Sequence, residues 1–224
     1  MSKQLFTVAI AFFSFLFAAG QSAMSDSLRQ AKDSTLRAMI HADSVKVEKD
    51  FAEKNKWDKI FAKVEYPLLK GSRNSGIIPV KDPTEIPDPT LDYKILFEVV
   101  ANNSDSTIKE INAGLDEVAR VINLHYASGI PVKRIIPVIV VHASALNALK
   151  NNEAYQKKYK TDNPNIKLID DMKKMGAVFI ACGQAMEFFD VKRDELLPGI
   201  KISLTAQTVI SSYQLKGYVW HMIN

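Results

Sequence analysis

The stretch "GAVFIACGQAM", residues 176–186, combines the features of a strand that passes directly into a helix. An unbroken apolar run from Ala177 to Ala181 is typical of a strand that is buried on both faces of a parallel sheet. Gly183 then allows the backbone to turn closely before a short helical pattern. The same stretch holds Cys182, the only cysteine of the chain. It therefore predicts both a strand–helix unit and a position where chemistry can take place.

Similar units lie on both sides of this stretch. Apolar runs suited to strands alternate with segments whose apolar residues recur every three or four positions, as on one face of a helix. This alternation predicts an α/β fold with a five-stranded, mostly parallel sheet flanked by helices. The expected strands are residues 93–100, 134–144, 177–182, 199–204 and 218–223, and the main expected helices are residues 106–129, 145–159, 165–176 and 205–217.

The N-terminal residues 1–20 have the pattern of a secretory signal peptide. Lys3 precedes an apolar run over residues 5–19, and small residues, Ala18, Ala19 and Gly20, follow at its end. A membrane anchor is the alternative, but the run is shorter than the ~20 residues that a spanning helix needs. We expect cleavage after Gly20, no membrane span thereafter, and a location in the periplasm or outside the cell.

Two further segments precede the α/β domain, which we place at residues 93–224. Residues 21–66 are rich in charge and poor in helix breakers, and they predict one or two amphipathic helices in an N-terminal extension. Residues 67–92 contain five prolines and two glycines, which exclude a long helix and indicate a stiffened linker.

Composition and motifs exclude several classes of function. The formal net charge of +4 comes from mixed charges without a basic stripe, so we expect no nucleic-acid partner. No G-x-G-x-x-G, phosphate-binding or G-x-S-x-G motif occurs, and the four histidines lack the spacing of zinc ligands. We therefore expect neither a metal nor a cofactor.

Ligands of open parallel sheets bind beyond the carboxyl ends of the strands. At these positions the sequence places Cys182 and His142 as candidate catalytic residues. A helix N-terminus after Cys182 would stabilise its thiolate, and His142 could accept a proton. A buried, inert cysteine is the alternative, as is a cysteine paired between chains. The expected pocket residues are Asn102, Gly183, Gln184 and Thr205.

The domain resembles the DsrE/DsrF-like family over residues 93–224. The resemblance lies in the order of elements and in three patterns: "VIVVHASAL", "GAVFIACGQAM" and "YQLKGYVWHMI". It implies a five-stranded sheet and a homo-oligomer. Sulfur-relay members carry sulfane sulfur as a persulfide on a cysteine after the third strand, the position of Cys182. The family's sulfur-relay members are cytoplasmic, whereas this chain is expected to be exported.

Two functions follow from these observations. The first is a sulfur-handling protein, a sulfurtransferase or sulfur carrier, which exchanges a persulfide at Cys182 with a donor or acceptor protein. The second is a non-catalytic ligand-binding or assembly module on the same fold. An accessible sulfur in a pocket favours the first, and a buried sulfur without nearby amides favours the second.

Overall fold

The computed structural model describes the backbone of residues 3–223 and the side chains of residues 27–223. The chain divides into two compact units, and the boundary between them in the sequence falls between Lys59 and Ile60. The expected signal peptide, residues 1–20, lies outside the residues whose side chains are described.

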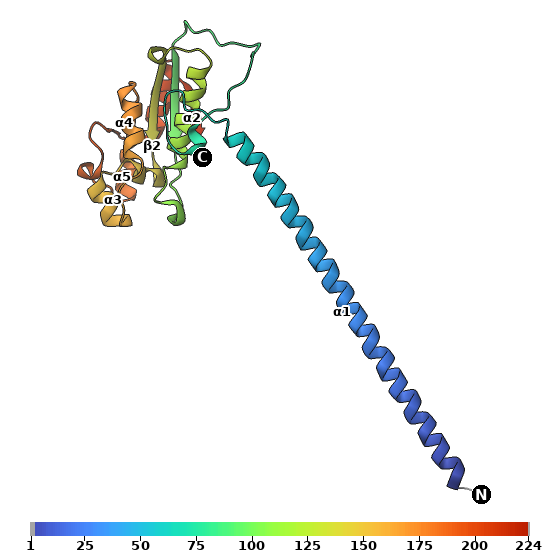
Figure 1. Cartoon of the computed structure of the whole chain (residues 1–224). Helices are drawn as coiled ribbons and strands as arrows, with labels where there is room; N and C mark the ends of the chain where they lie inside the picture. The colour runs from blue at the N-terminus through green and yellow to red at the C-terminus, as the bar shows by residue number, and fades with distance from the viewer. Residues whose placement is uncertain (1–2, 224) are drawn as a thin grey trace. The chain divides into compact units, whose positions relative to one another are not determined.

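The first unit is formed by one long helix, α1 (Lys3–Phe61), shown in blue in Figure 1. The expected N-terminal helix is thereby confirmed. Its described large apolar side chains are exposed, among them Phe51 and Trp57. Among the residues described, no helix combines the length and the apolar character needed to cross a membrane.

The second unit contains a sheet of five strands that are parallel throughout, which confirms the predicted α/β fold. The strands follow the spatial order β4-β3-β2-β1-β5, so the last strand in sequence pairs with the first. Apolar residues fill the central strands because helices cover both faces. The strands are β1 (Tyr93–Val99), β2 (Ile135–Val141), β3 (Val178–Cys182), β4 (Lys201–Ser203) and β5 (Val219–Ile223).

The helices α2 and α6 lie on opposite faces of the sheet. A Cβ on Gly114, in the first turn of α2, would lie 2.7 Å from Cγ1 of Val99, so α2 packs on the face that contains Val99. The first residue of α6, Ala206, contacts Cys182 on the other face. Figure 1 shows α2 and α4 beside β2. The helices of this unit are α2 (Ala113–Ala127), α3 (Asn152–Tyr159), α4 (Ile166–Lys174), α5 (Gly183–Phe188) and α6 (Ala206–Leu215).

Two helices begin later than the sequence pattern predicts. The periodicity suggested a helix from residue 106, but α2 begins at Ala113 because the side chain of Asn112 accepts hydrogen bonds from the backbone of Gly114 and Leu115. Likewise, the segment from residue 145 is a 3-10 helix, η4 (Ala143–Leu149), and α3 starts only after Asn151. In both cases an asparagine side chain, rather than the apolar spacing, fixes the helix start. The remaining 3-10 helices are η1 (Arg73–Ser75), η2 (Asp105–Thr107), η3 (Val132–Arg134) and η5 (Arg193–Glu195).

The start of the proline-rich segment is fixed to α2. We call residues 66–77 the strap. Asn123 of α2 is fully buried and binds the strap through four hydrogen bonds, to the backbone of Leu68, Leu69 and Ser75. Asp116 lies two helical turns earlier on α2, and its carboxylate accepts hydrogen bonds from the backbone N–H and the hydroxyl of Ser72. The strap therefore belongs to the folded domain.

Candidate functional site

Cys182 is the last residue of β3 and lies at the carboxyl end of the sheet. Its side chain is buried, with 4% of its surface exposed, and it forms no disulfide. The backbone N–H of Ala206, the first residue of α6, donates a hydrogen bond to Sγ over 3.3 Å. An N–H donor at the start of a helix stabilises negative charge on the sulfur. The cysteine is thus buried and in contact with one backbone amide.

Gly183 sets the position of this sulfur. A Cβ on Gly183 would lie 2.6 Å from the backbone oxygen of Ser203 in β4. Any other residue would push β4 away, and the chain leads from β4 directly to the start of α6. Gln184 also donates its backbone N–H to the oxygen of Leu204 over 3.0 Å. Close packing of these backbones brings the α6 amide to Cys182.

His142 stands next to Cys182 at the same end of the sheet. Val141 pairs with Ala181 in the register of β2 and β3, so His142 and Cys182 each follow that pair by one residue. Both also line one cavity. The following residue, Ala143, has a φ of 50°, in the left-handed region that alanine rarely adopts. Strained backbone of this kind is concentrated at functional sites.

The imidazole of His142 is held from the opposite side by Glu98. Its Nε2 lies 2.8 Å from Oε1 of Glu98, a residue of β1 that is 8% exposed. The other carboxylate oxygen, Oε2, accepts a hydrogen bond of 3.0 Å from the indole Nε1 of Trp220 in β5. Two neighbouring strands and the residue after a third thus contribute the chain Trp220–Glu98–His142, which leads to the cavity of Cys182.

The cavity that contains Cys182 and His142 has a volume of about 490 Å³. This volume lies in the range of small-molecule sites. Its lining is mostly apolar, and His142 and Cys182 are the two ionisable side chains among the residues that line it. The other described residues that line it are Ala143, Gln184, Ala185, Phe188 and Phe189.

The structure brings some of the predicted site residues together and leaves others outside. Gln184 lines the cavity with Cys182 and His142. Thr205 instead caps α6, where its hydroxyl accepts from the backbone of Gln207 over 3.4 Å. The side-chain amide of Asn102 contacts the hydroxyl of Tyr159. Burial, and to a lesser extent the charge of Tyr159, raises the pKa of Tyr155 to about 12. Neither Asn102 nor Thr205 is among the residues that line this cavity.

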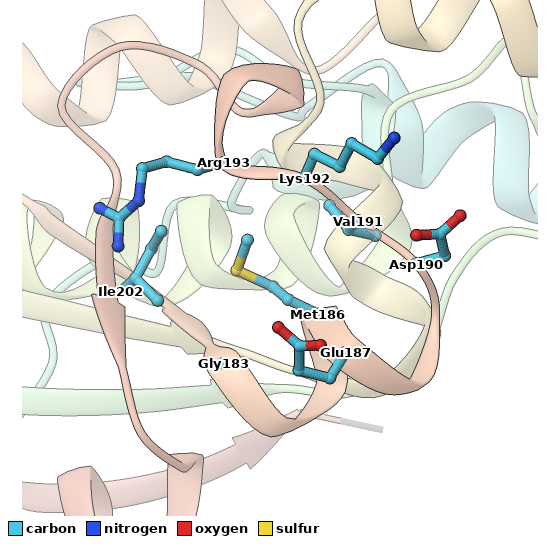
Figure 2. A pocket seen from close by; sticks show the side chains of 8 residues that line it. All are labelled: Gly183, Met186, Glu187, Asp190, Val191, Lys192, Arg193 and Ile202. Carbon is cyan, nitrogen blue, oxygen red and sulfur yellow. The ribbon is translucent and has the colours of Figure 1, made fainter.

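A second cavity of about 350 Å³ lies beside α5, and Gly183 belongs to its wall. Figure 2 shows the side chains of Met186 and Ile202 within it, with the charged groups of Glu187 and Arg193 nearby. Among the described residues, its acidic and basic side chains form no ion pairs with one another. It contains no nucleophile comparable to Cys182, so the first cavity is the candidate site.

Sequence reasoning missed Glu98 and Trp220. Glu98 did carry a signal, since it is the one acidic residue of its strand and follows the apolar run Ile95–Phe97. The role of Trp220 depends on the pairing of β5 with β1, which no local pattern reveals. Among the described residues, no group of three or more His, Cys, Asp or Glu side chains is arranged to hold a metal ion.

Comparison with known proteins assigns the domain. The model of the DsrE/DsrF-like family matches residues 94–220. The chain belongs to the DsrE/DsrF-like family. A solved structure that is similar to this chain is that of the protein of unknown function MTH1491 from Methanobacterium thermoautotrophicum. The two sequences are 18% identical, the TM-score is 0.43, and the match covers 58% of this chain and 99% of that chain. No curated protein matches the sequence significantly.

Proposed function

We propose that this DsrE/DsrF-like protein carries sulfane sulfur as a persulfide on Cys182. The observation that carries the proposal is the environment of Sγ: an amide N–H of α6 contacts it, and it shares a cavity with His142. Membership of a family that includes sulfur-relay proteins supports the same function. The thiolate is the form of cysteine that attacks another sulfur.

The proposed transfer is a thiol–persulfide exchange. The Cys182 thiol gives its proton to His142, and Sγ attacks the outer sulfur of a donor R–S–SH. A bond forms between Sγ and that outer sulfur, while the S–S bond of the donor breaks. The leaving thiolate takes the proton from His142, so the products are the Cys182 persulfide and R–SH. No external oxidant or reductant is required, and an acceptor thiol reverses the same step.

The site favours a small donor that carries little charge. Cys182 is buried, and the cavity that leads to it is lined mostly by apolar groups without a lysine or arginine. A dianion such as thiosulfate would lose its hydration there without a cationic partner. A small alkyl hydropersulfide avoids this cost, whereas a cysteine of a protein partner would have to enter on an extended segment.

Mass spectrometry of the intact protein tests the proposal. After incubation with a small alkyl hydropersulfide, the folded wild-type protein should gain the mass of one sulfur atom, and dithiothreitol should remove it. Cys182→Ser should gain nothing, since the chain contains no other cysteine. Sulfur that is acquired only after denaturation would refute the proposal and leave a packing role for Cys182.

The second candidate function is the non-catalytic binding or assembly module. The burial of Cys182 at 4% exposure favours it, because a free cysteine often serves as a small apolar core residue. The module would still use the cavity for a ligand, but its sulfur would not be modified. The mass measurement therefore separates the two functions.

We also propose that the protein is a homo-oligomer that forms through the edge of β5. Trp220 and Met222 expose 44% and 52% of their surfaces on this edge strand, and exposed apolar edges commonly mark interfaces. Light scattering should give a multiple of the subunit mass, and Met222→Lys should lower it. The same change at Ile86, an exposed residue of the linker, should have no effect. A wild-type monomer would reject the oligomer.

A further inference from the structure

Glu98 is a charged residue in a position where the fold alone calls for an apolar one. It lies in the interior of β1, between Phe97 and Val99, which are both fully buried. Burial of a carboxylate is strongly unfavourable unless hydrogen bonds replace its hydration. An apolar residue would avoid that cost, so a role for the carboxylate itself must be sought in its two partners.

Those partners occupy both carboxylate oxygens. Oε1 lies 2.8 Å from Nε2 of His142, and Oε2 lies 3.0 Å from Nε1 of Trp220. An ionised carboxylate can only accept hydrogen bonds, and the indole N–H of tryptophan can only donate. The His142 contact must therefore be a hydrogen bond from Nε2–H to Glu98.

This contact decides which nitrogen of His142 is available for chemistry. In a neutral imidazole only one nitrogen carries a proton. With the proton on Nε2, Nδ1 is left with a lone pair. Among the described residues, the side chain of His142 is hydrogen-bonded through Nε2 and not through Nδ1, and His142 lines the cavity that contains Cys182. The free acceptor is thus the nitrogen that the exchange reaction needs.

We propose that Glu98 is a positioning residue that sets the tautomer of His142. We also propose that the indole N–H of Trp220 requires a hydrogen-bond acceptor from residue 98. This inference rests on the proposed persulfide function, since it assigns the proton acceptor for Cys182. In the exchange, Nδ1 receives the thiol proton and returns it to the leaving thiolate. Glu98 keeps its hydrogen bond from Nε2–H and stabilises the imidazolium while His142 holds that proton.

The variant Glu98→Gln isolates this role because it preserves shape while reversing one hydrogen bond. The indole N–H of Trp220 requires an acceptor, so the glutamine oxygen must face Trp220 and its NH₂ group must face His142. That NH₂ group needs a lone pair on Nε2, which moves the imidazole proton to Nδ1. Nδ1 would then be a donor and could not accept the thiol proton.

The second variant, Trp220→Phe, removes the group that fixes the glutamine. In Glu98→Gln/Trp220→Phe the amide can rotate and present its oxygen to Nε2–H of His142. The original tautomer is then restored without restoring the charge.

The experiment follows persulfide formation by timed mass spectrometry and the tautomer of His142 by ¹⁵N NMR. Glu98→Gln should slow sulfur uptake on the order of 10²-fold, which is typical of lost general acid–base catalysis. The double variant should recover at least about tenfold of the loss seen in Glu98→Gln, with Trp220→Phe alone measured as its reference. The NMR signals should show an unprotonated Nδ1 in the wild type and in the double variant, and a protonated Nδ1 in Glu98→Gln.

Several outcomes would overturn the inference. A wild-type tautomer with the proton on Nδ1 would do so without any variant, even if Glu98→Gln failed to fold. Wild-type uptake by Glu98→Gln after a confirmed tautomer change would also do so, as would slow uptake without that change. If the wild type took up no sulfur at all, the proposed function would fail, whereas the tautomer signals would still decide what Glu98 and Trp220 do.

Discussion

Replacement of Asn123 by alanine should lower the free energy of unfolding by about 3–5 kcal/mol, a large effect for one substitution. Asn123 is fully buried in α2, and its amide satisfies backbone groups of Leu68, Leu69 and Ser75. Alanine would leave these groups without partners inside the protein. Each unsatisfied buried group costs about 1–3 kcal/mol, and partial entry of water would reduce the total. The midpoint of thermal unfolding should fall by about 10 °C.

The same substitution should release the strap. Its attachment to α2 rests on Asn123 and Asp116. Lys70 is already exposed, so loss of the first should free the strap backbone and allow trypsin to cleave after Lys70. Asn74→Ala provides the matched control, because Asn74 lies in the strap with an exposed side chain. This control should change neither the unfolding midpoint nor the cleavage rate. Equal stability of the two variants would show that the strap is not held through Asn123.

Much of the sheet could be predicted from sequence because its strands are buried on both faces. Near-continuous apolar runs mark β1, β2 and β3, and these runs need no knowledge of the neighbouring strands. The helix starts were harder to predict. Ile108 and Ile111 continue the helical spacing of α2, yet Asn112 caps the helix after them. One local hydrogen-bonding side chain thus outweighs the periodicity, which reports only that a residue faces the core.

The candidate site was predictable to the extent that it depends on strand ends. Cys182 and His142 both follow apolar strands, and the general rule for parallel sheets places them together. Glu98 and Trp220 depend on the order of the strands, because β5 returns to pair with β1. The carboxylate in the apolar run of β1 was the one visible trace of this arrangement. A charge within a buried strand is therefore a reason to look for its partners on the adjacent strands.

The substitution Gly183→Ala should damage both stability and the proposed sulfur transfer. The added Cβ would lie 2.6 Å from the backbone oxygen of Ser203 and 3.4 Å from that of Leu204. The first distance is too short for two atoms in contact, and a backbone oxygen cannot turn aside as a flexible side chain can. Strand β4 must therefore shift, at a cost of about 1–3 kcal/mol or more.

The shift of β4 should reach Cys182 through the start of α6. The chain runs from Ser203 to Ala206 in three residues, so a displaced β4 moves the N–H that contacts Sγ. Without this donor the thiolate is less stable, and persulfide formation should slow by about tenfold for each 1.4 kcal/mol of lost stabilisation of the transition state. Urea unfolding and timed mass spectrometry measure the two effects.

Glu187→Ala is the matched control for Gly183→Ala. Glu187 lies in the same helix, α5, and its side chain is exposed. Both variants therefore introduce an alanine into α5, but the Cβ at position 187 meets no backbone oxygen of β4. This control should retain the stability of the wild type. If Gly183→Ala matched it in both stability and sulfur uptake, then close contact between α5 and β4 would not be what positions the α6 amide. The stabilisation of the Cys182 thiolate would have to be sought elsewhere in the cavity.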